Sequence, residues 1–143
     1  MRLVKQGVVI DVKNNKQQIN EIARHLTNGD VYCVNSMDYA FHAAAYVAWK
    51  NVGGKLLIQN PLMPEPIQQR LYQQAQNVEY TDVVMIPTSG TTGVPKLRSY
   101  GHEQDRYYFQ TTMNTQEFDK NTKYLCFVPP FVWILAHIHD RMV

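Results

Sequence analysis

Short apolar runs rich in branched side chains alternate along this chain with longer stretches whose apolar residues recur at helical spacing. The runs at 8–12, 31–34, 55–58 and 82–87 have the length and composition of buried β-strands. Strands that alternate with helices along a chain usually pair in parallel, because each helix crosses over the sheet between them. We therefore predict an α/β fold in which a mostly parallel sheet has helices on both faces.

Three helices are predicted between these strands. The first has an apolar stripe, made by Ile19, Ile22, Ala23 and Leu26. The second runs over about 37–52, with Ser36 as its N-cap and the glycine pair 53–54 as its end. The third begins at a first-turn proline, either Pro64 or Pro66, because a helix makes no use of the backbone N–H at that position.

The size and charge of the chain set limits on its class. Its 143 residues, 45% of them hydrophobic, are enough to bury the core of one domain. We find no repeat, linker or low-complexity tract, so we predict a single domain over residues 1–143. Charged residues make up 18%, and the formal net charge of +2 is not gathered into a basic run. We therefore predict no nucleic-acid partner.

Neither export nor membrane insertion is indicated. Residues 1–6 lack the apolar core of a signal peptide. The longest apolar stretch, 124–138, is broken by a proline pair and is too short to span a bilayer. Cys33 and Cys126 both lie in apolar strand-like segments, where a thiol behaves as a small hydrophobic group. We therefore predict a cytoplasmic protein with free thiols and no membrane span.

The segment that points to chemistry follows directly on the strand at 82–87. Its sequence over 87–96 is Pro-Thr-Ser-Gly-Thr-Thr-Gly-Val-Pro-Lys. Gly90 and Gly93 permit positive φ and a close approach of the backbone, so that successive N–H groups can point at phosphate oxygens. Lys96 adds a cation, and further donors come from the hydroxyl groups of Thr88, Ser89, Thr91 and Thr92. The segment is therefore predicted to bind a polyphosphate.

Two other interpretations of this segment fit its sequence less well. A surface turn rich in Ser, Thr and Gly needs no fixed order of residues, whereas the order here is specific. The phosphate-binding loop of kinases and other NTPases ends in Gly-Lys-Ser/Thr and opens a helix. Here Lys96 follows Pro95, and residues 97–100 predict a short strand before a helix that begins at about His102.

The order Thr-Ser-Gly-Thr-Thr-Gly-x-Pro-Lys resembles the signature loop of the AMP-binding, adenylate-forming superfamily. This superfamily includes acyl-CoA synthetases, luciferases and the adenylation domains of peptide synthetases. Further similarity, from about Ile19 onward, lies at Asn35-Ser36, 48–54, Asn60-Pro61, His102 and 128–131. The chain departs from the family pattern at Leu97, where Gly is common, and at Val132, where His is common.

The resemblance implies that residues 1–143 form a single, truncated N-terminal subdomain of an adenylate-forming enzyme. Such enzymes join a carboxylate to the α-phosphate of ATP, release pyrophosphate, and pass the acyl-adenylate to a thiol, usually that of coenzyme A. The family pattern implies that ATP is bound with Mg²⁺ and that Lys96 is catalytic. It assigns cofactor binding to Thr88, Ser89, Gly90, Thr91, Thr92, Gly93 and Lys96. The family's adenine pocket and its other catalytic groups correspond to sequence beyond this chain, which is therefore expected to be inactive alone.

Two functional hypotheses follow. In the first, the chain is a fragment of an AMP-forming ligase, similar to acyl-CoA synthetases, that acts on ATP and a carboxylic acid. In the second, it is a non-catalytic phosphate-binding or assembly module. A subdomain of this kind leaves sheet edges and apolar patches exposed, so we also predict a homo-oligomer, formed through these edges by exchange of residues 124–143.

Other candidate features have simpler interpretations. His137 and His139 alternate near the end of the chain, but no third and fourth ligands accompany them, so we predict no metal site. His25 and His42 lie on predicted helices without a partner motif and are interpreted as structural. The aromatic cluster at 106–109 is predicted to be a helix face packed against the sheet.

Overall fold

The computed structural model describes residues 2–5, 8–11, 15–88 and 95–116, together with Pro129 and Phe131. Its elements, in chain order, are β1 (Arg2–Lys5), β2 (Val8–Asp11), α1 (Lys16–Thr27), β3 (Val31–Asn35), α2 (Tyr39–Val52), β4 (Lys55–Gln59), α3 (Glu65–Gln76), β5 (Val83–Pro87), β6 (Leu97–Gly101) and α4 (His102–Gln116). The strands and helices predicted within these residues are all present, with small shifts at their ends.

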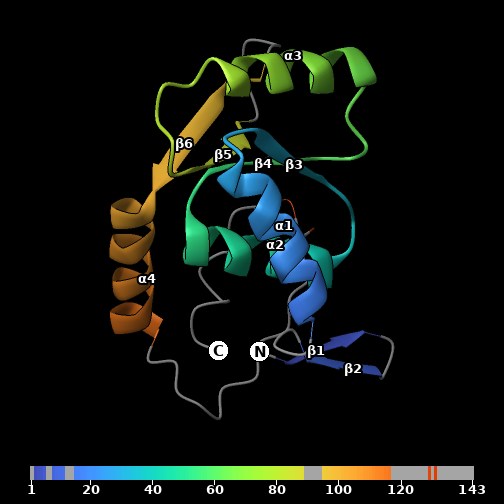
Figure 1. The fold of residues 1–143 in the computed structure, drawn as a ribbon. Helices are drawn as coiled ribbons and strands as arrows, with labels where there is room; N and C mark the ends of the chain where they lie inside the picture. Colours follow the sequence, from blue (N-terminus) through green and yellow to red (C-terminus); the bar gives the residue numbers. More distant parts are fainter. Residues whose placement is uncertain are drawn as a thin grey trace.

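Strands β3 to β6 form one sheet in that order (Figure 1). β4 pairs in parallel with both β3 and β5, whereas β6 runs antiparallel to β5. A parallel pair needs a crossover connection, which α2 supplies between β3 and β4 and α3 supplies between β4 and β5. The antiparallel pair needs none, so residues 88–96 connect β5 directly to β6. The predicted α/β fold with a mostly parallel sheet is confirmed.

The strand predicted at 8–12 is present as β2, but it is not part of this sheet. It pairs antiparallel with β1, which the sequence did not indicate, and the two form a separate two-stranded sheet. β1 is only four residues long and has Arg2 and Lys5 at its ends, so it lacks the apolar run that marks a strand. Pairing with the nearest strand in sequence closes a short loop and therefore costs little chain entropy.

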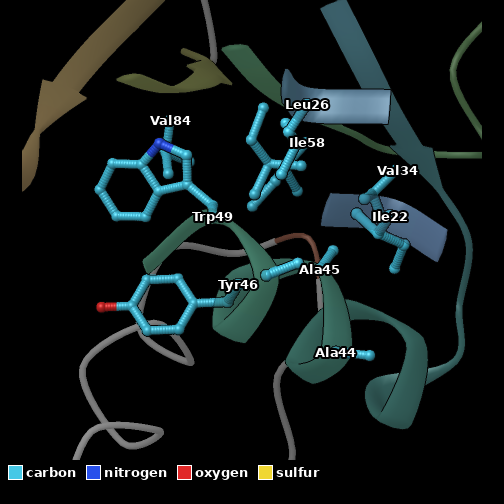
Figure 2. Packing of buried hydrophobic residues seen from close by; sticks show 11 residues of the cluster. Ile22, Leu26, Val34, Ala44, Ala45, Tyr46, Trp49, Ile58 and Val84 are labelled. Atoms are coloured by element: carbon cyan, nitrogen blue, oxygen red, sulfur yellow. The ribbon is translucent and has the colours of Figure 1, made fainter. Parts of the chain in front are cut away.

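Helices α1 and α2 cover one face of the four-stranded sheet. α2 places Ala44, Ala45 and Ala48 in this interface with no more than 1% of their surface exposed, and such small side chains let the helix backbone approach closely. The indole of Trp49, also on α2, is fully buried and lies beside Val84 of β5 (Figure 2). This helix is therefore the element most deeply packed in the core.

Helix α3 covers the opposite face, as Figure 1 shows. Leu57 and Met85 point to this side and pack in one cluster with Ala75 of α3. Their neighbours in the strands, Leu56 and Val84, belong to the cluster on the other side. This alternation is expected of strands buried on both faces, and it confirms the prediction that helices cover both faces of the sheet.

The start of α2 differs from the prediction. The N-cap is Asp38 rather than Ser36, and Asp38 Oδ1 accepts a hydrogen bond from the backbone N–H of Ala40 at 2.9 Å. Ser36 Oγ instead accepts a hydrogen bond from the backbone N–H of Asp38 at 3.0 Å. This hydrogen bond closes a short turn before the helix, so the helix begins after Asp38. The predicted glycine end is confirmed, because Gly53 has a φ of 73° and a Cβ there would collide with the Asp82 carboxylate.

Candidate functional site

The carboxyl ends of the three parallel strands meet at one edge of the sheet. Asn35 ends β3, Gln59 ends β4, and these two residues are register partners. β5 ends at Pro87, and Thr88 follows it directly. In parallel α/β sheets this edge is where loops gather and ligands bind. The predicted phosphate-binding segment therefore begins where the fold most favours a binding site.

The two ends of the predicted segment are joined by hydrogen bonds. The backbone N–H of Thr88 donates to the carbonyl oxygen of Lys96 at 2.7 Å, and the N–H of Lys96 donates to Thr88 Oγ1 at 3.4 Å. These bonds continue the β5–β6 ladder by one residue pair beyond Pro87 and Leu97. The segment thus leaves and re-enters the sheet at a base that hydrogen bonds between Thr88 and Lys96 close.

Lys96 and Thr88 are the two predicted binding residues that the structure describes. The Lys96 side chain is exposed, and within the described residues its ammonium group has no salt-bridge partner. A compact cation in this state is available to an anionic ligand. Thr88 is half-buried, and its hydroxyl faces the backbone of the lysine. The other predicted residues, Ser89, Gly90, Thr91, Thr92 and Gly93, lie outside the described residues.

A network of amide side chains occupies the same edge on the α3 side. Asn35 Nδ2 donates to Gln68 Oε1 at 2.7 Å, and Gln59 Nε2 donates to the carbonyl oxygen of Gln68 at 3.0 Å. Gln68 Nε2 in turn donates to the carbonyl oxygen of Met63 at 2.6 Å. The network connects the ends of β3 and β4 to α3. Sequence reasoning missed it, because Gln68 is far from Asn35 in the chain.

An open groove of about 450 Å³ runs beside this network. Its lining is mostly amide side chains, with Glu65, Tyr72 and Cys33 among the rest. Cys33 is a free cysteine, as predicted, and burial raises the pKa of its thiol to about 11. Because the thiolate is the nucleophilic form, Cys33 is not a candidate for covalent catalysis. The groove offers neutral hydrogen-bonding groups rather than a reactive centre.

His42 lies in the first turn of α2, which follows the carboxyl end of β3. Its Nε2 donates a hydrogen bond to the carbonyl oxygen of Ser36 at 2.7 Å, while Nδ1 is buried and has no hydrogen-bond partner among the described residues. Burial lowers the pKa of His42, and the Ser36 carbonyl and the Asp38 carboxylate oppose this shift. His42 is therefore neutral at physiological pH and carries its hydrogen on Nε2.

A second polar cluster lies where α4 meets α2. Asp105 has only 1% of its surface exposed, and Tyr46 Oη lies 2.7 Å from both of its carboxylate oxygens, which share the single hydroxyl hydrogen. Lys50 Nζ lies 2.8 Å from Asp105 Oδ2. His102 stacks on Trp49, with ring centroids 4.1 Å apart and planes 4° apart. Sequence reasoning missed this cluster, because α2 and α4 are far apart in the chain.

This cluster is remote from the predicted phosphate-binding segment. His102 opens α4, as predicted, but it follows Gly101, which pairs with Val83 at the amino end of β5. Thr88 lies at the other end of the same strand. The prediction that residues 106–109 pack against the sheet is wrong for Arg106 and Tyr107, whose side chains are exposed, because α4 turns Asp105 toward α2 instead.

The described residues hold no group of three or more His, Cys, Asp or Glu side chains that could bind a metal ion. No helix in this part of the chain is both long and apolar enough to cross a membrane. His137, His139 and Cys126 lie outside the described residues, so the predictions made for them stay predictions.

The described geometry thus brings together Thr88 and Lys96 at the carboxyl edge, and it separates His102 from them. Nothing in the described residues supplies a pair of groups arranged for acid–base or nucleophilic catalysis at this edge. What the edge offers is an exposed cation and a closed loop base, which suit the binding of an anion.

Neither a scan against models of known protein families nor a search of curated proteins found a match to this chain.

Proposed function

We propose that this chain is the phosphate-binding part of an ATP-dependent, AMP-forming ligase of the acyl-CoA synthetase type. The observation that carries the proposal is the way in which the segment 87–96 is held. It connects the carboxyl end of β5 to β6, its ends are hydrogen-bonded to each other, and its lysine is exposed and without a salt-bridge partner among the described residues. Both this position and the order of its residues suit a polyphosphate ligand.

In the proposed reaction, a carboxylate oxygen of the acid attacks the α-phosphorus of ATP. The bond from that phosphorus to the oxygen bridging to the β-phosphate breaks, and pyrophosphate leaves with the electron pair. A thiol, proposed to be that of coenzyme A, then attacks the acyl carbon and displaces AMP. Lys96 binds the β- and γ-phosphates and stabilises the negative charge that grows on the leaving pyrophosphate.

Thr88 contributes by fixing the base of the segment, where its backbone and side chain are hydrogen-bonded to the backbone of Lys96. Mg²⁺, when bound with ATP, would neutralise phosphate charge, and it commonly takes most of its ligands from phosphate and water. Such a mode of binding requires no dedicated cluster of protein carboxylates. The proposal assigns phosphate binding to this chain, and it assigns no step of acyl transfer to a described residue.

The test is calorimetric titration of Mg·ATP and of pyrophosphate into the purified chain. Lys96→Ala should weaken the binding of both ligands about tenfold or more, because a charge-assisted contact to phosphate is lost. Lys16→Ala is the matched control, since it removes an equally exposed lysine from α1 and should leave the affinity unchanged. If the wild-type chain binds neither ligand, or if both variants behave alike, the proposal is wrong.

The alternative, a non-catalytic phosphate-binding or assembly module, is favoured by the outer strands of the sheet. β3 and β6 each have one strand neighbour among the described strands, and an open strand edge pairs readily with another chain. This observation also supports the proposed homo-oligomer. The coding sequence separates the two hypotheses: a reading frame that continues past Val143 into the rest of a ligase supports the fragment, whereas a stop codon directly after Val143, in a chain that binds pyrophosphate and has the light-scattering mass of a dimer, supports the module.

A further inference from the structure

We propose that Asp105 is a positioning residue for Lys96. It anchors the unit formed by β6 and α4, and this unit begins directly after the phosphate-binding lysine. The inference rests on the proposed function, because it assigns a role to Asp105 in phosphate binding by Lys96. Asp105 itself lies at the far end of β6 and does not touch the ligand.

The unit is continuous in sequence. Lys96 is followed by β6 without an intervening residue, and β6 is followed by α4 in the same way. The corner between them is closed by a hydrogen bond of 3.0 Å from the backbone N–H of Gly101 to Gln104 Oε1. No flexible linker therefore separates the first turn of α4 from the strand that carries the lysine, and a shift of one displaces the other.

Among the described residues of this unit, no apolar side chain is fully buried. None of the side chains of β6 is fully buried, and Arg98 and Ser99 are exposed. Among the described side chains of α4, Asp105 alone is buried. Most surface helices are held by an apolar stripe that faces the core. The side chain that is buried among the described residues of α4 is a carboxylate, so its polar partners contribute to the position of the helix.

Those partners belong to the best-packed helix of the molecule. Tyr46 is 4% exposed and is a member of the core cluster, and it donates to both oxygens of Asp105. Lys50, one turn further along α2, forms the ion pair. The stack of His102 on Trp49 adds a second contact between the same two helices. A buried charge that loses its partners is strongly destabilised, so the cluster tolerates few arrangements of α4 relative to α2.

β6 is thus held at both ends. At one end the carbonyl oxygen of Lys96 accepts from Thr88, and at the other end Asp105 joins α4 to α2. A strand of five residues spans about 16 Å, which is short enough for both attachments to fix its direction. Lys96 then starts from a fixed backbone position, and less conformational freedom is lost when its ammonium group meets a phosphate.

A double-mutant cycle with pyrophosphate as the ligand tests this role. Asp105→Asn should weaken pyrophosphate binding about tenfold when Lys96 is present, a loss within the range found for residues of one coupled network. In the Lys96→Ala background the same change should alter the affinity less than about twofold, because the residue on which Asp105 acts is gone. Equal losses in the two backgrounds, or no loss in either, would overturn the inference.

Glu103→Gln is the matched control. It makes the same change from carboxylate to amide in the same first turn of α4, at an exposed position, and should leave the affinity for pyrophosphate unchanged. Tyr46→Phe is the milder variant to use if Asp105→Asn does not fold. It removes one donor and keeps the ion pair with Lys50, so it should produce a smaller loss with the same dependence on Lys96. An equal loss with and without Lys96 in this variant also overturns the inference.

Amide hydrogen exchange separates this inference from the proposed function. If the wild-type chain does not bind pyrophosphate, the proposed function fails, and the anchoring of β6 is judged by exchange alone. Asp105→Asn should then speed exchange at the backbone amides of β6 and leave those of β3 and β4 unchanged, since the latter depend on the core. Unchanged exchange in β6 would show that Asp105 does not hold the strand.

Discussion

Two lysines, one near each end of β6, have opposite roles. At the carboxyl edge of the parallel strands, Lys96 is exposed and has no salt-bridge partner among the described residues. At the other edge, Lys50 is paired at 2.8 Å with a carboxylate that is almost completely buried. The first arrangement leaves a charge available to a ligand, whereas the second uses a charge to hold two helices together. Changes at the anchoring edge should therefore affect stability, and changes at the binding edge should affect affinity.

The largest effect on stability is expected for Trp49→Ala, at the anchoring edge. Trp49 is fully buried and stacks on His102, so its removal leaves a large cavity and removes one of the contacts between α2 and α4. The free energy of unfolding should fall by about 3–5 kcal/mol, as for other buried aromatic residues. Urea unfolding followed by circular dichroism measures this, with the exposed Val52→Ala on the same helix as control. A loss in Trp49→Ala no greater than that of the control would contradict the comparison.

The ion pair at the same edge gives the next test. Asp105→Leu should lower the free energy of unfolding by about 3 kcal/mol, because it removes the buried carboxylate that both Lys50 and Tyr46 contact. Adding Tyr46→Phe and Lys50→Met should restore most of this loss, since apolar groups of similar size often replace a buried charge cluster without cost. The triple variant should nevertheless bind pyrophosphate more weakly than the wild-type chain. Full affinity in a stable triple variant would mean that the charges do not determine the position of β6.

A smaller effect, which depends on pH, is expected from His42. Its folded-state pKa is lowered by burial, so the unfolded chain takes up the proton first as pH falls. The contribution of neutral His42 is complete above the ordinary pKa of 6.5 and is lost progressively as pH falls below that value. The free energy of unfolding, measured by urea titration between pH 7.5 and 5.5, should decline in the wild-type chain. His42→Gln should show a shallower decline, and an identical slope would refute this assignment.

The smallest change in stability is expected for Lys96→Ala. Its side chain is exposed and makes no ion pair with the described residues, so the free energy of unfolding should change by less than about 0.5 kcal/mol. The same variant should give the greatest loss of pyrophosphate affinity. A variant that keeps its stability but loses pyrophosphate affinity would most clearly distinguish the role of the binding edge from that of the anchoring edge. A large loss of stability in Lys96→Ala would show that the lysine is structural.

The sequence predicted the main elements of the fold because each of them is specified locally. Apolar runs marked β3, β4 and β5, and the glycine pair 53–54 marked the end of α2. The N-cap of α2 was misplaced by two residues, because Ser36 and Asp38 both satisfy the local rule and only their hydrogen bonds distinguish them. Local sequence rules also could not predict which strand β2 pairs with, because an apolar strand can pair with the edge of any sheet.

The candidate site likewise has one part that the local sequence predicted and one part that it did not. The order of residues in 87–96 predicted a polyphosphate ligand, and that prediction depends on chemistry carried by one short segment. The role of Asp105 could not be predicted, because its partners on α2 are 55 and 59 residues away in the chain. In the sequence, Asp105 is one of two acidic residues near the start of α4, the other being Glu103. Its burial, and hence its energetic importance, is a property of the packed structure.

The sequence by itself therefore determined where most strands and helices form and which loop is predicted to bind phosphate, because both depend on residues that are neighbours in the chain. The tertiary structure alone decided which strands pair, which lysine is left available to a ligand and which is held in an ion pair. The physical reason is that the environment of a charge is set by the groups packed around it. For Lys50 and Asp105 those groups come from two helices that only the fold brings together.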